Sequence, residues 1–573
     1  MAVLPQFDYL FAIGTIFAFL DAWNIGANDV ANSFATSVAS RSLTLKQAML
    51  IASAMEFTGA MAVGARVADT IRTKVISVRL FEEDPSVLML AMVCAVVGSS
   101  IYLTIATRFS MPVSTTHSIM GGVIGVGIAA IGAEGINWGW DGVSQVFAAW
   151  AIAPGIAGCF GAIIFLLTKY GVMRRKNPVK KAFIAVPIYF FITSALLTLL
   201  IVWKGGSARI SLNDAETAGV IVGTGAAVAL IVCIFFIPYL YRKVMIGDWQ
   251  LRWWHIPQGP FLLRRGEVPP RPADATSGIQ DYYRGHMTRE ELEAKKAAEG
   301  ASNDVEKHPY STAAPKGELS DILPAPARES AEGPSKEQLS IPKNIPPPGK
   351  WYNPVVAFWW MKYAFWHGVE QDVVDMQKKR DFLSGDLEEM HATGEHFDNE
   401  AEYTYSFLQV LTAATSSFSH GANDVSNAIG PYTTIYFIWQ TGNISSKVPV
   451  PSWILAFGGA AIVIGLWTYG YNIMRALGNK ITLHSPSRGF SMELGSAITI
   501  IMATRLKLPI STTQCICGAT VGVGLCNGTW RTINWRMVAW IYMGWIITLP
   551  TAGIISGCLM GIVLNAPRWG MGV

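Results

Sequence analysis

Long apolar segments recur through both ends of the chain, and most are long enough to cross a lipid bilayer as a helix. A helix of about 20 apolar residues spans the roughly 30 Å hydrocarbon core of a membrane. Only 15% of the 573 residues are charged, whereas soluble domains usually carry about 25%. Lipid therefore surrounds most of this fold, and the sequence predicts an all-α polytopic membrane protein.

About twelve transmembrane segments are predicted, in two groups. The intervening stretch is rich in Pro, Lys, Glu, Ser and Gln, which is typical of a largely disordered hydrophilic loop. The predicted domains are an N-terminal transmembrane half (1–241), a cytoplasmic loop (242–402) and a C-terminal transmembrane half (403–573). Within the loop, an aromatic-rich interfacial helix is expected near residues 351–380; a short extra span there would invert everything after it. The predicted segments are 7–33, 45–65, 87–106, 114–133, 143–168, 182–203 and 217–241, then 403–429, 453–478, 489–506, 511–526 and 535–565.

Basic residues predict the orientation. The connection from Lys169 to Lys181 holds six Lys or Arg residues and no acid, so it should face the cytoplasm. Counting spans from there places the central loop inside and both termini outside. The glycosylation pattern at Asn443 then lies outside, and the one at Asn527 lies inside, where it would stay unused. No removable signal peptide is expected at the start of the chain, and the first span should direct insertion.

Two sequence elements occur once in each half. Gly26–Asn32 recurs as Gly421–Asn427 with one difference, and Thr107–Thr116 recurs as Thr504–Thr513. The match continues through glycines that more plausibly serve close helix packing than ligand contact. Seven predicted segments separate the two copies, and an odd number reverses the direction of the second copy. The halves should therefore be inverted-topology repeats with broken helices or re-entrant hairpins, an architecture of transporters with a central site. The aligned glycines are Gly121, Gly125 and Gly127 with Gly518, Gly522 and Gly524.

The first element suits a hard cation. Asp29 and Asp424 lie in apolar runs, where a carboxylate costs on the order of 3 kcal/mol. Gly26 and Gly421 are expected to loosen the helix so that backbone carbonyls point inward. Carboxylate, amide and peptide oxygens suit Na⁺ better than a soft metal; the alternative is a capped helix terminus with interhelical hydrogen bonds. The predicted Na⁺ ligands are Asn28, Asp29, Asn32, Asn423, Asp424 and Asn427.

The second element, Pro-x-Ser-Thr-Thr, has the pattern of a helix start. Helix N-termini bind anions through free N–H groups, so two opposed starts could hold a tetrahedral oxyanion at the membrane centre. Ordinary capping inside a bundle is the alternative. The copies then diverge to His117 and Gln514. The predicted anion-binding residues are Ser114, Thr115, Thr116, Ser511, Thr512, Thr513 and Gln514.

Two further carboxylates, Glu56 and Glu493, lie in apolar segments and are functional candidates. Each could bind a second cation, take up a proton, or pair with an arginine. In the loop, a solvated charged stretch is expected at His391, Glu395, His396 and Asp398 in preference to a metal site. The arginines considered are Arg66, Arg108, Arg475 and Arg505.

Together, the two Gly-Ala-Asn-Asp-Val copies and the two Pro-x-Ser-Thr-Thr copies resemble the inorganic phosphate transporter family, and most closely its fungal plasma-membrane Na⁺/phosphate symporters. The resemblance covers both membrane halves. It implies phosphate held between the Ser-Thr-Thr helix starts, Na⁺ at the Asn-Asp elements, and carboxylates at Glu56 and Glu493 that matter for transport.

We therefore expect a secondary active transporter that imports phosphate with Na⁺ by alternating access. Expected partners are phosphate, Na⁺ and membrane lipid, with no nucleic acid, no cofactor and a possible homo-oligomer. Alternatives are coupling to H⁺, another oxyanion such as sulfate or arsenate, and a receptor or scaffold built around the central loop. An enzyme is not expected, because the sequence shows no nucleophile–base pair or metal cluster with recognisable spacing.

Overall fold

The structure is a computed structural model that describes residues 4–76, 78–202, 212–270, 278–306, 353–356, 358–360, 383–445, 448–476, 478–506, 508 and 510–566. The chain divides into two units. One contains residues 1–288 and 368–573 and holds the membrane helices; the other contains residues 289–367 and includes helix α10 (Arg289–Glu306). The site described below lies within the first unit.

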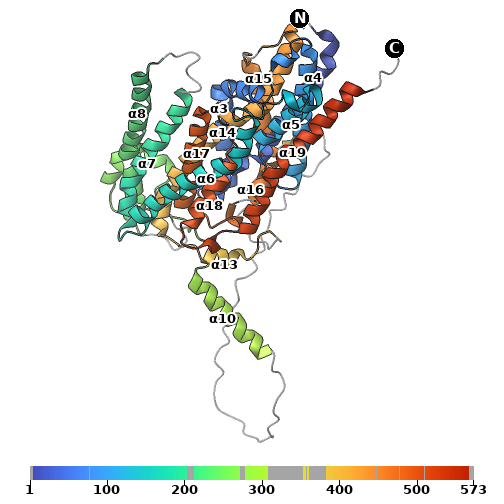
Figure 1. The fold of residues 1–573 in the computed structure, drawn as a ribbon. Coiled ribbons are helices and arrows are strands. Elements are labelled where there is room, and N and C mark those ends of the chain that lie inside the picture. Colours follow the sequence, from blue (N-terminus) through green and yellow to red (C-terminus); the bar gives the residue numbers. More distant parts are fainter. Residues whose placement is uncertain are drawn as a thin grey trace, which may run out of the picture. The chain divides into compact units, whose positions relative to one another are not determined.

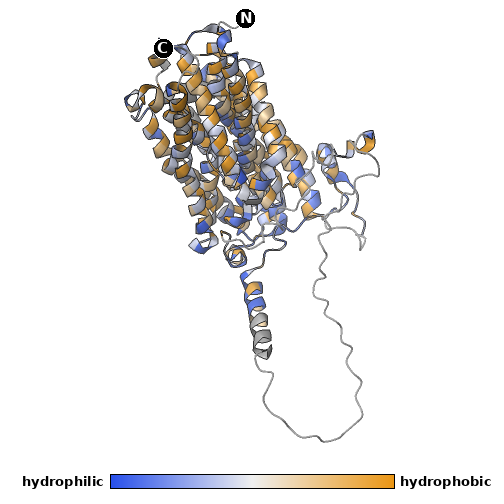
Figure 2. Ribbon diagram, turned by 90° about the vertical axis from the view of Figure 1, so that its right-hand side faces the viewer, coloured by the Kyte–Doolittle hydropathy of each residue, from blue (hydrophilic) through white to orange (hydrophobic). Residues whose placement is uncertain are grey.

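Every predicted transmembrane segment coincides with a helix or a broken pair of helices (Figure 1). Among the described residues, eight helical spans are long and apolar enough to cross a membrane, and Figure 2 shows hydrophobic residues along the length of the bundle. The all-α prediction is confirmed. The helices are α1 (Asp8–Asn28), α2 (Val30–Ala39), α3 (Leu45–Lys74), α4 (Pro85–Arg108), α5 (Thr115–Ile131), α6 (Val143–Thr168), α7 (Pro178–Leu200), α8 (Asp214–Ile231), α9 (Ile237–Leu240), α13 (Leu387–Ala392), α14 (Asn399–Thr441), α15 (Ser452–Gly465), α16 (Tyr471–Ala476), α17 (Pro486–Arg505), α18 (Thr512–Leu525) and α19 (Trp535–Asn565).

Helices α1 and α14, which carry the two Gly-Ala-Asn-Asp-Val copies, run in opposite directions. Trp439, near the end of α14, donates a hydrogen bond to Asp8 at the start of α1. About two turns further into both helices, Tyr432 bonds to Thr15. The two copies therefore enter the bundle from opposite ends, as expected for an inverted repeat.

Helices α4 and α5 form one hairpin, and α17 and α18 form another. The residues that flank the first hairpin meet where Ile76 pairs with Ile136. Those that flank the second meet where the backbone N–H of Asn534 donates to the carbonyl of Ile481. The tips of both hairpins reach Asp29, so both end inside the bundle, and the prediction of re-entrant hairpins is confirmed.

The repeated glycines allow close helix packing in the same pattern in each half. A Cβ on Gly121 would lie 2.3 Å from the carbonyl oxygen of Leu549 on α19. In the other half, a Cβ on Gly518 would lie 2.2 Å from that of Pro154 on α6. Such approaches require the missing Cβ of glycine. The backbones of α5 and α18 are thereby held against α19 and α6.

Both ends of the central loop are folded. Tyr282 and Tyr283 are buried, and the hydroxyl of Tyr283 donates to Glu402 on α14. Arg242 pairs with Asp248 in a buried contact. The expectation of disorder therefore does not hold at these ends. Of the predicted interfacial helix, residues 354–356 and 358–360 are helical, residue 353 forms a bend, and the rest lies outside the described residues.

The stretch predicted to be solvated is also packed against the membrane domain. His391 is buried, and the ring of His396 stacks on Tyr283 with 4.3 Å between centroids. Asp398 caps α14, and Glu395 forms ion pairs with Lys169 and Arg174. The expectation that this stretch is solvated was therefore wrong for His391, which is buried, whereas Glu395 and His396 are partly buried and Asp398 is exposed.

Candidate functional site

A helix starts at the tip of each hairpin, with a serine as its N-cap residue. Ser114 is the N-cap of α5, and its hydroxyl accepts a hydrogen bond from the N–H of His117. Ser511 is the N-cap of α18, but its hydroxyl makes no capping bond. Ordinary capping therefore accounts for Ser114 but not for the four threonines that follow the two serines.

Asp29 accepts a hydrogen bond from each hairpin. The hydroxyl of Thr115, in its own half, donates to Oδ2 at 2.6 Å, and the hydroxyl of Thr513, in the other half, donates to Oδ1 at 2.8 Å. Asn32, one turn along, donates to the Thr513 hydroxyl at 2.8 Å. The carboxylate thus lies where the two hairpin tips meet.

Asp424 repeats this arrangement with the halves exchanged. Thr512 of its own half donates to Oδ2 at 2.8 Å, and Thr116 of the other half lies 3.5 Å from Oδ1. The amide of Asn427 donates to the hydroxyls of Thr115 and Thr116. The two halves therefore contribute equivalent residues to one site. Each of its eight residues is at most 6% exposed: Asp29, Asn32, Thr115, Thr116, Asp424, Asn427, Thr512 and Thr513.

Asn32 and Asn427 each keep an amide oxygen without a hydrogen-bond donor. Both oxygens are buried next to the aspartates, and unpaired buried acceptors are costly. Two carboxylates and two free amide oxygens form a set of hard oxygen donors that suits Na⁺. Asn423 lies beside this set and donates to Oδ1 of Asp424.

Asn28, predicted as a ligand, is turned away from the aspartates. Its amide nitrogen donates to Thr107 and to the carbonyl of Met111, and its oxygen accepts from the N–H of Val113. These three bonds fasten the first hairpin tip to α1, so both ends of the Asn28 amide are already used. Its expected role as a cation ligand therefore receives no support from the geometry.

Gly26 and Gly421 do not loosen their helices as expected. A Cβ on Gly26 would lie 1.9 Å from the carbonyl oxygen of Ile462, and one on Gly421 would lie 2.3 Å from that of Glu56. Helix α14 continues unbroken through Gly421, and the first copy breaks only at Asp29. Both glycines therefore serve close packing, and the expected loosening of the helix is absent at Gly421.

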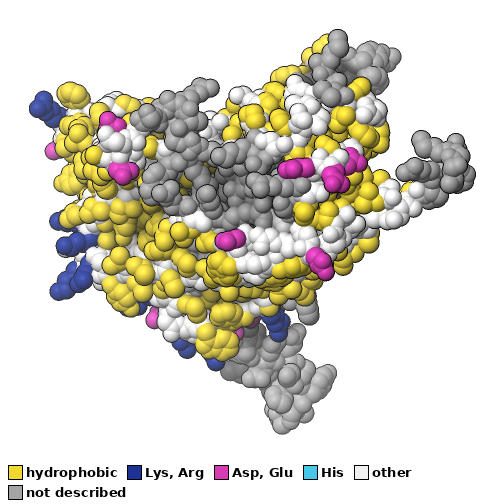
Figure 3. Space-filling model, turned by 45° about the horizontal axis from the view of Figure 1, so that its top comes forward, with side chains coloured by type: hydrophobic (Ala, Val, Ile, Leu, Met, Phe, Trp, Pro, Cys, Tyr) yellow, Lys and Arg dark blue, Asp and Glu magenta, His cyan; other side chains and the backbone are white. Residues whose placement is uncertain are grey.

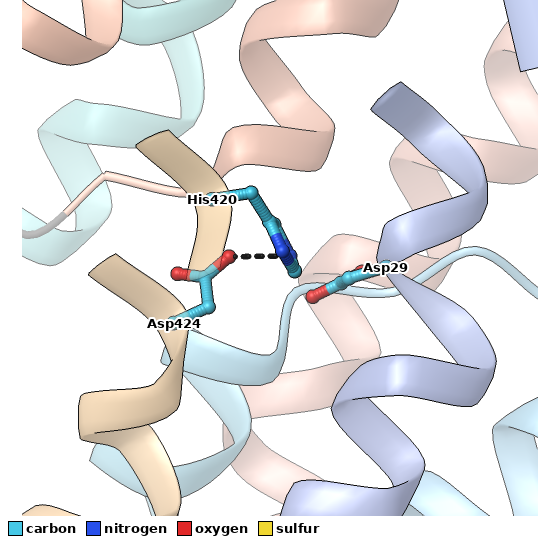
Figure 4. Close-up of side chains that lie close together, drawn as sticks. All are labelled: Asp29, His420 and Asp424. Atoms are coloured by element: carbon cyan, nitrogen blue, oxygen red, sulfur yellow. Dashed lines mark ion pairs between the residues drawn. The ribbon is translucent and has the colours of Figure 1, made fainter. Parts of the chain in front are cut away.

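His420 was absent from the predicted site and lies at its centre. Its Nε2 is 2.9 Å from Oδ2 of Asp424, and its Nδ1 is 2.8 Å from Oε2 of Glu56. Ligand atoms of Asp29, His420 and Asp424 all lie within 4.8 Å of one another (Figure 4). Nδ1 forms a hydrogen bond with Glu56, whereas Nε2 lies at ion-pair distance from Asp424 without forming one. A ring that carries two protons would place a positive charge between the two carboxylates.

Glu56 and Glu493 occupy different surroundings. Glu56 pairs with His420 and accepts from Ser417 at 2.7 Å. Of the arginines considered, Arg108 is exposed at the end of α4, and the side chains of the other three lie outside the described residues. Glu493 accepts hydrogen bonds from four neutral groups: the hydroxyls of Thr36, Ser37 and Thr412, and the amide of Gln409.

Gln514 and His117, which follow the two Ser-Thr-Thr sequences, are fully buried. Neither polar atom of the Gln514 side chain and neither ring nitrogen of His117 has a hydrogen-bond partner. Buried polar groups normally have partners. A bound anion would give the Gln514 amide an acceptor.

Comparison with known proteins places these residues in a recognised context. Residues 25–556 match the Phosphate transporter family. The chain is 61% identical to the phosphate-repressible phosphate permease pho-4 of Neurospora crassa, over 99% of both chains. It is 29% identical to the sodium-dependent phosphate transporter 2 of Xenopus tropicalis, over 98% of this chain and 99% of the relative.

A solved structure described as the sodium-dependent phosphate transporter shares the fold. It aligns with a TM-score of 0.63 and 25% identity, over 98% of this chain and 100% of that chain. These relatives are transporters and not enzymes. The chain is a multi-pass membrane protein that belongs to the phosphate transporter family.

Proposed function

We propose that this protein imports phosphate into the cell together with Na⁺ by alternating access. The observation that carries the proposal is the sharing of threonine hydroxyls between two buried carboxylates, one from each half. The proposed Na⁺ ligands are Asp29, Asn32, Asp424 and Asn427. The proposed phosphate donors are the hydroxyls of Thr115, Thr116, Thr512 and Thr513, with the Gln514 amide.

The hydroxyl groups supply a physical reason for coupling. A hydroxyl has one proton to donate and two lone pairs that can accept or bind a cation. Without Na⁺, the protons of Thr115 and Thr513 are directed at Asp29. When Na⁺ binds the carboxylate, the lone pairs of these hydroxyls can face the ion and their protons can turn to phosphate. Na⁺ thus releases the donors that phosphate needs.

Charge favours the same order of events. Phosphate placed beside Asp29 and Asp424 without a cation would meet two carboxylates in a site shielded from water, where like charges repel strongly. Na⁺ offsets that repulsion, so the fully loaded carrier can reorient and the partly loaded carrier cannot do so readily. The proposed transport needs no cofactor beyond the transported ions.

The burial of the site supports alternating access. Asp29 and Asp424 are each 1% exposed, so phosphate reaches them only after a rearrangement. A small cavity of about 20 Å³ lies beside Asn32 and is lined by His484 and Thr520, on the side of the α17–α18 hairpin. We take this side as the route toward the cytoplasm.

The proposed location is the plasma membrane, with both termini outside. Figure 3 shows the end of the molecule where the chain starts, with Asp and Glu scattered over it and Lys and Arg at its margins. The basic connection follows the C-terminal end of α6, at the end of the bundle opposite to the one where the chain starts. The positive-inside rule requires such a connection on a cytoplasmic face. Asn443, in the exposed loop after α14, is then on the outer side.

Purified protein in liposomes tests the proposal directly. Uptake of radiolabelled phosphate is measured under an inward Na⁺ gradient, an inward H⁺ gradient, or neither, with unlabelled sulfate and arsenate as competitors. We expect uptake only with Na⁺, and no competition from sulfate. Uptake driven equally well by H⁺ alone would refute Na⁺ coupling, and competition by sulfate as strong as that by unlabelled phosphate would refute phosphate selectivity.

A further inference from the structure

A second buried carboxylate environment lies away from the central site, between α1 and α4. Asp21 is fully buried on α1, and among the described residues no Lys, Arg or His forms an ion pair with it. Its Oδ1 lies 3.4 Å from the hydroxyl of Ser100, and its Oδ2 has no hydrogen-bond partner. A carboxylate in this position requires a compensating charge or a proton.

Asn24, one turn along α1, faces the same part of α4. Its amide nitrogen donates to Thr104 at 3.0 Å and contacts the carbonyl of Ser100. Its amide oxygen, like Oδ2 of Asp21, is buried without a partner. Two acceptor oxygens on neighbouring positions of one helix face therefore both lack a donor.

The hydroxyls of α4 complete an oxygen-rich environment. Ser100 donates to the carbonyl of Phe17, one turn before Asp21, and Ser99 lies beside the carboxylate while its hydroxyl contacts Ser118 on α5. A single proton on Asp21 would satisfy two of these oxygens at most. Several hard oxygens around one carboxylate are the ligand set of a small hard cation.

We propose that Asp21, Asn24, Ser99 and Ser100 form an additional Na⁺-binding site, which we name the α1–α4 site. It lies about 12 Å from Asp29 along α1, because eight residues separate the two at 1.5 Å each. It is nearer the end of the helix where the chain starts. An ion could therefore bind at the α1–α4 site without any rearrangement of the threonine hydroxyls of the central site.

The duplication does not produce this site twice. Asp21 and Asn24 lie eight and five residues before Asp29, and the matching positions before Asp424 are Ser416 and Ser419. The second half therefore has no carboxylate there. The α1–α4 site is a separate addition to the first half, and Ser416 provides a matched control.

Binding of ²²Na⁺ to purified protein, without phosphate, tests the proposal. The double variant Asp29→Asn with Asp424→Asn, which removes both carboxylates of the central site, should retain Na⁺ binding that excess NaCl displaces and choline chloride does not, and adding Asp21→Asn should abolish it. In otherwise unaltered protein, Asp21→Asn should raise the Na⁺ concentration for half-maximal phosphate uptake about tenfold, the scale of losing one charged ligand. Ser100→Ala should act in the same direction with a smaller effect, and Ser416→Ala should change neither measurement.

The opposite result has a defined meaning. Because Asn mimics a protonated Asp, unchanged Na⁺ binding and uptake kinetics in Asp21→Asn would show a permanently protonated structural acid and overturn the proposal. Ser100→Ala answers the same question if Asp21→Asn fails to fold. Since ²²Na⁺ binding to the variant that lacks both central carboxylates does not depend on coupled uptake, failure of the α1–α4 site is distinguishable from failure of the proposed symport.

Discussion

The hydroxyl of Thr513 donates a 2.8 Å hydrogen bond to Oδ1 of Asp29, although 484 positions separate the two residues. Thr513 lies in the first turn of α18, at the tip of the hairpin of one half, and Asp29 follows the last residue of the first helix of the other. The same hydroxyl accepts from the amide of Asn32 at 2.8 Å. One side chain thus connects the proposed cation ligands to the proposed anion donors.

Replacement of Thr513 by Val should therefore weaken the binding of both phosphate and Na⁺. We expect the half-saturating concentrations of phosphate and of Na⁺ each to rise about tenfold, since hydrogen bonds to charged groups contribute about 1.5–3 kcal/mol. Liposome uptake over both concentration ranges measures this. Thr499→Val is the control, because the buried Thr499 hydroxyl bonds only to the carbonyl of Gly495 in its own helix. A rise in the phosphate value alone would contradict the connecting role.

His420→Asn should lower uptake more than tenfold, because it removes the cationic group between Glu56 and Asp424. Removing one partner of a buried ion pair costs about 3–5 kcal/mol. The control is Ser419→Ala, whose hydroxyl bonds only to the carbonyl of Thr415 in the same helix. Uptake near the original level in His420→Asn would show that the two carboxylates need no partner.

Melting temperatures also test the pairing of His420 with Glu56. If His420→Asn leaves Glu56 with an unpaired charge, then adding Glu56→Gln should restore part of the lost melting temperature. Residues in direct contact show such non-additive effects, whereas distant residues do not. Strictly additive losses in the double variant would contradict a direct pairing.

Much of the fold follows from the sequence because lipid imposes strong requirements on it. Apolar segments of sufficient length, and two motifs repeated in the same order, were enough to predict the helices and the opposed hairpins. The aspartates and threonines of the site were also predictable, since carboxylates and hydroxyl-rich helix starts are unusual in apolar surroundings. Each of these signals is contained within a few consecutive residues of the chain.

What escaped prediction depends on contacts between distant positions. His420 bonds to Glu56 across 364 positions, although a polar ring directly before Gly421, where the first copy has Ile25, was a signal in the sequence. Asn28 has the composition of a ligand, and only the path of the hairpin tip shows that its amide is already used. The buried pair Tyr282 and Tyr283 was hidden by the polar composition of the surrounding loop.

Gly26→Ala should destabilise the protein. The new Cβ would lie 1.9 Å from the backbone carbonyl of Ile462, which cannot move aside as a flexible side chain could. Overpacking of this kind costs about 1–3 kcal/mol or more. Thermal unfolding in detergent should show a clear drop for Gly26→Ala and none for Gly155→Ala, where nothing lies within 4 Å of the added atom. Equal melting temperatures would contradict the packing role.

Glu395 provides a test of the folded loop. It accepts two 2.8 Å hydrogen bonds from Arg174 and lies 3.1 Å from Nζ of Lys169, so it joins the loop to the end of α6. Burial of Glu395 acts to raise its pKa, but the hydrogen bonds and charges of Arg174 and Lys169 outweigh burial and lower the pKa below its ordinary value of 4.5. A carboxyl group whose pKa is lowered by folding stabilises the folded state above its unfolded pKa.

Glu395→Gln should therefore melt at a lower temperature than the original protein near neutral pH, because the amide cannot replace the charge. The difference should shrink as the pH falls below about 4.5, since protonation of Glu395 removes the same interaction from the original protein. Melting in detergent from about pH 7.5 to pH 4 measures this, with the exposed Glu134→Gln as the control for general acid effects. A difference that persisted unchanged at pH 4, or none at neutral pH, would show that the ion pairs with α6 do not hold the loop in place.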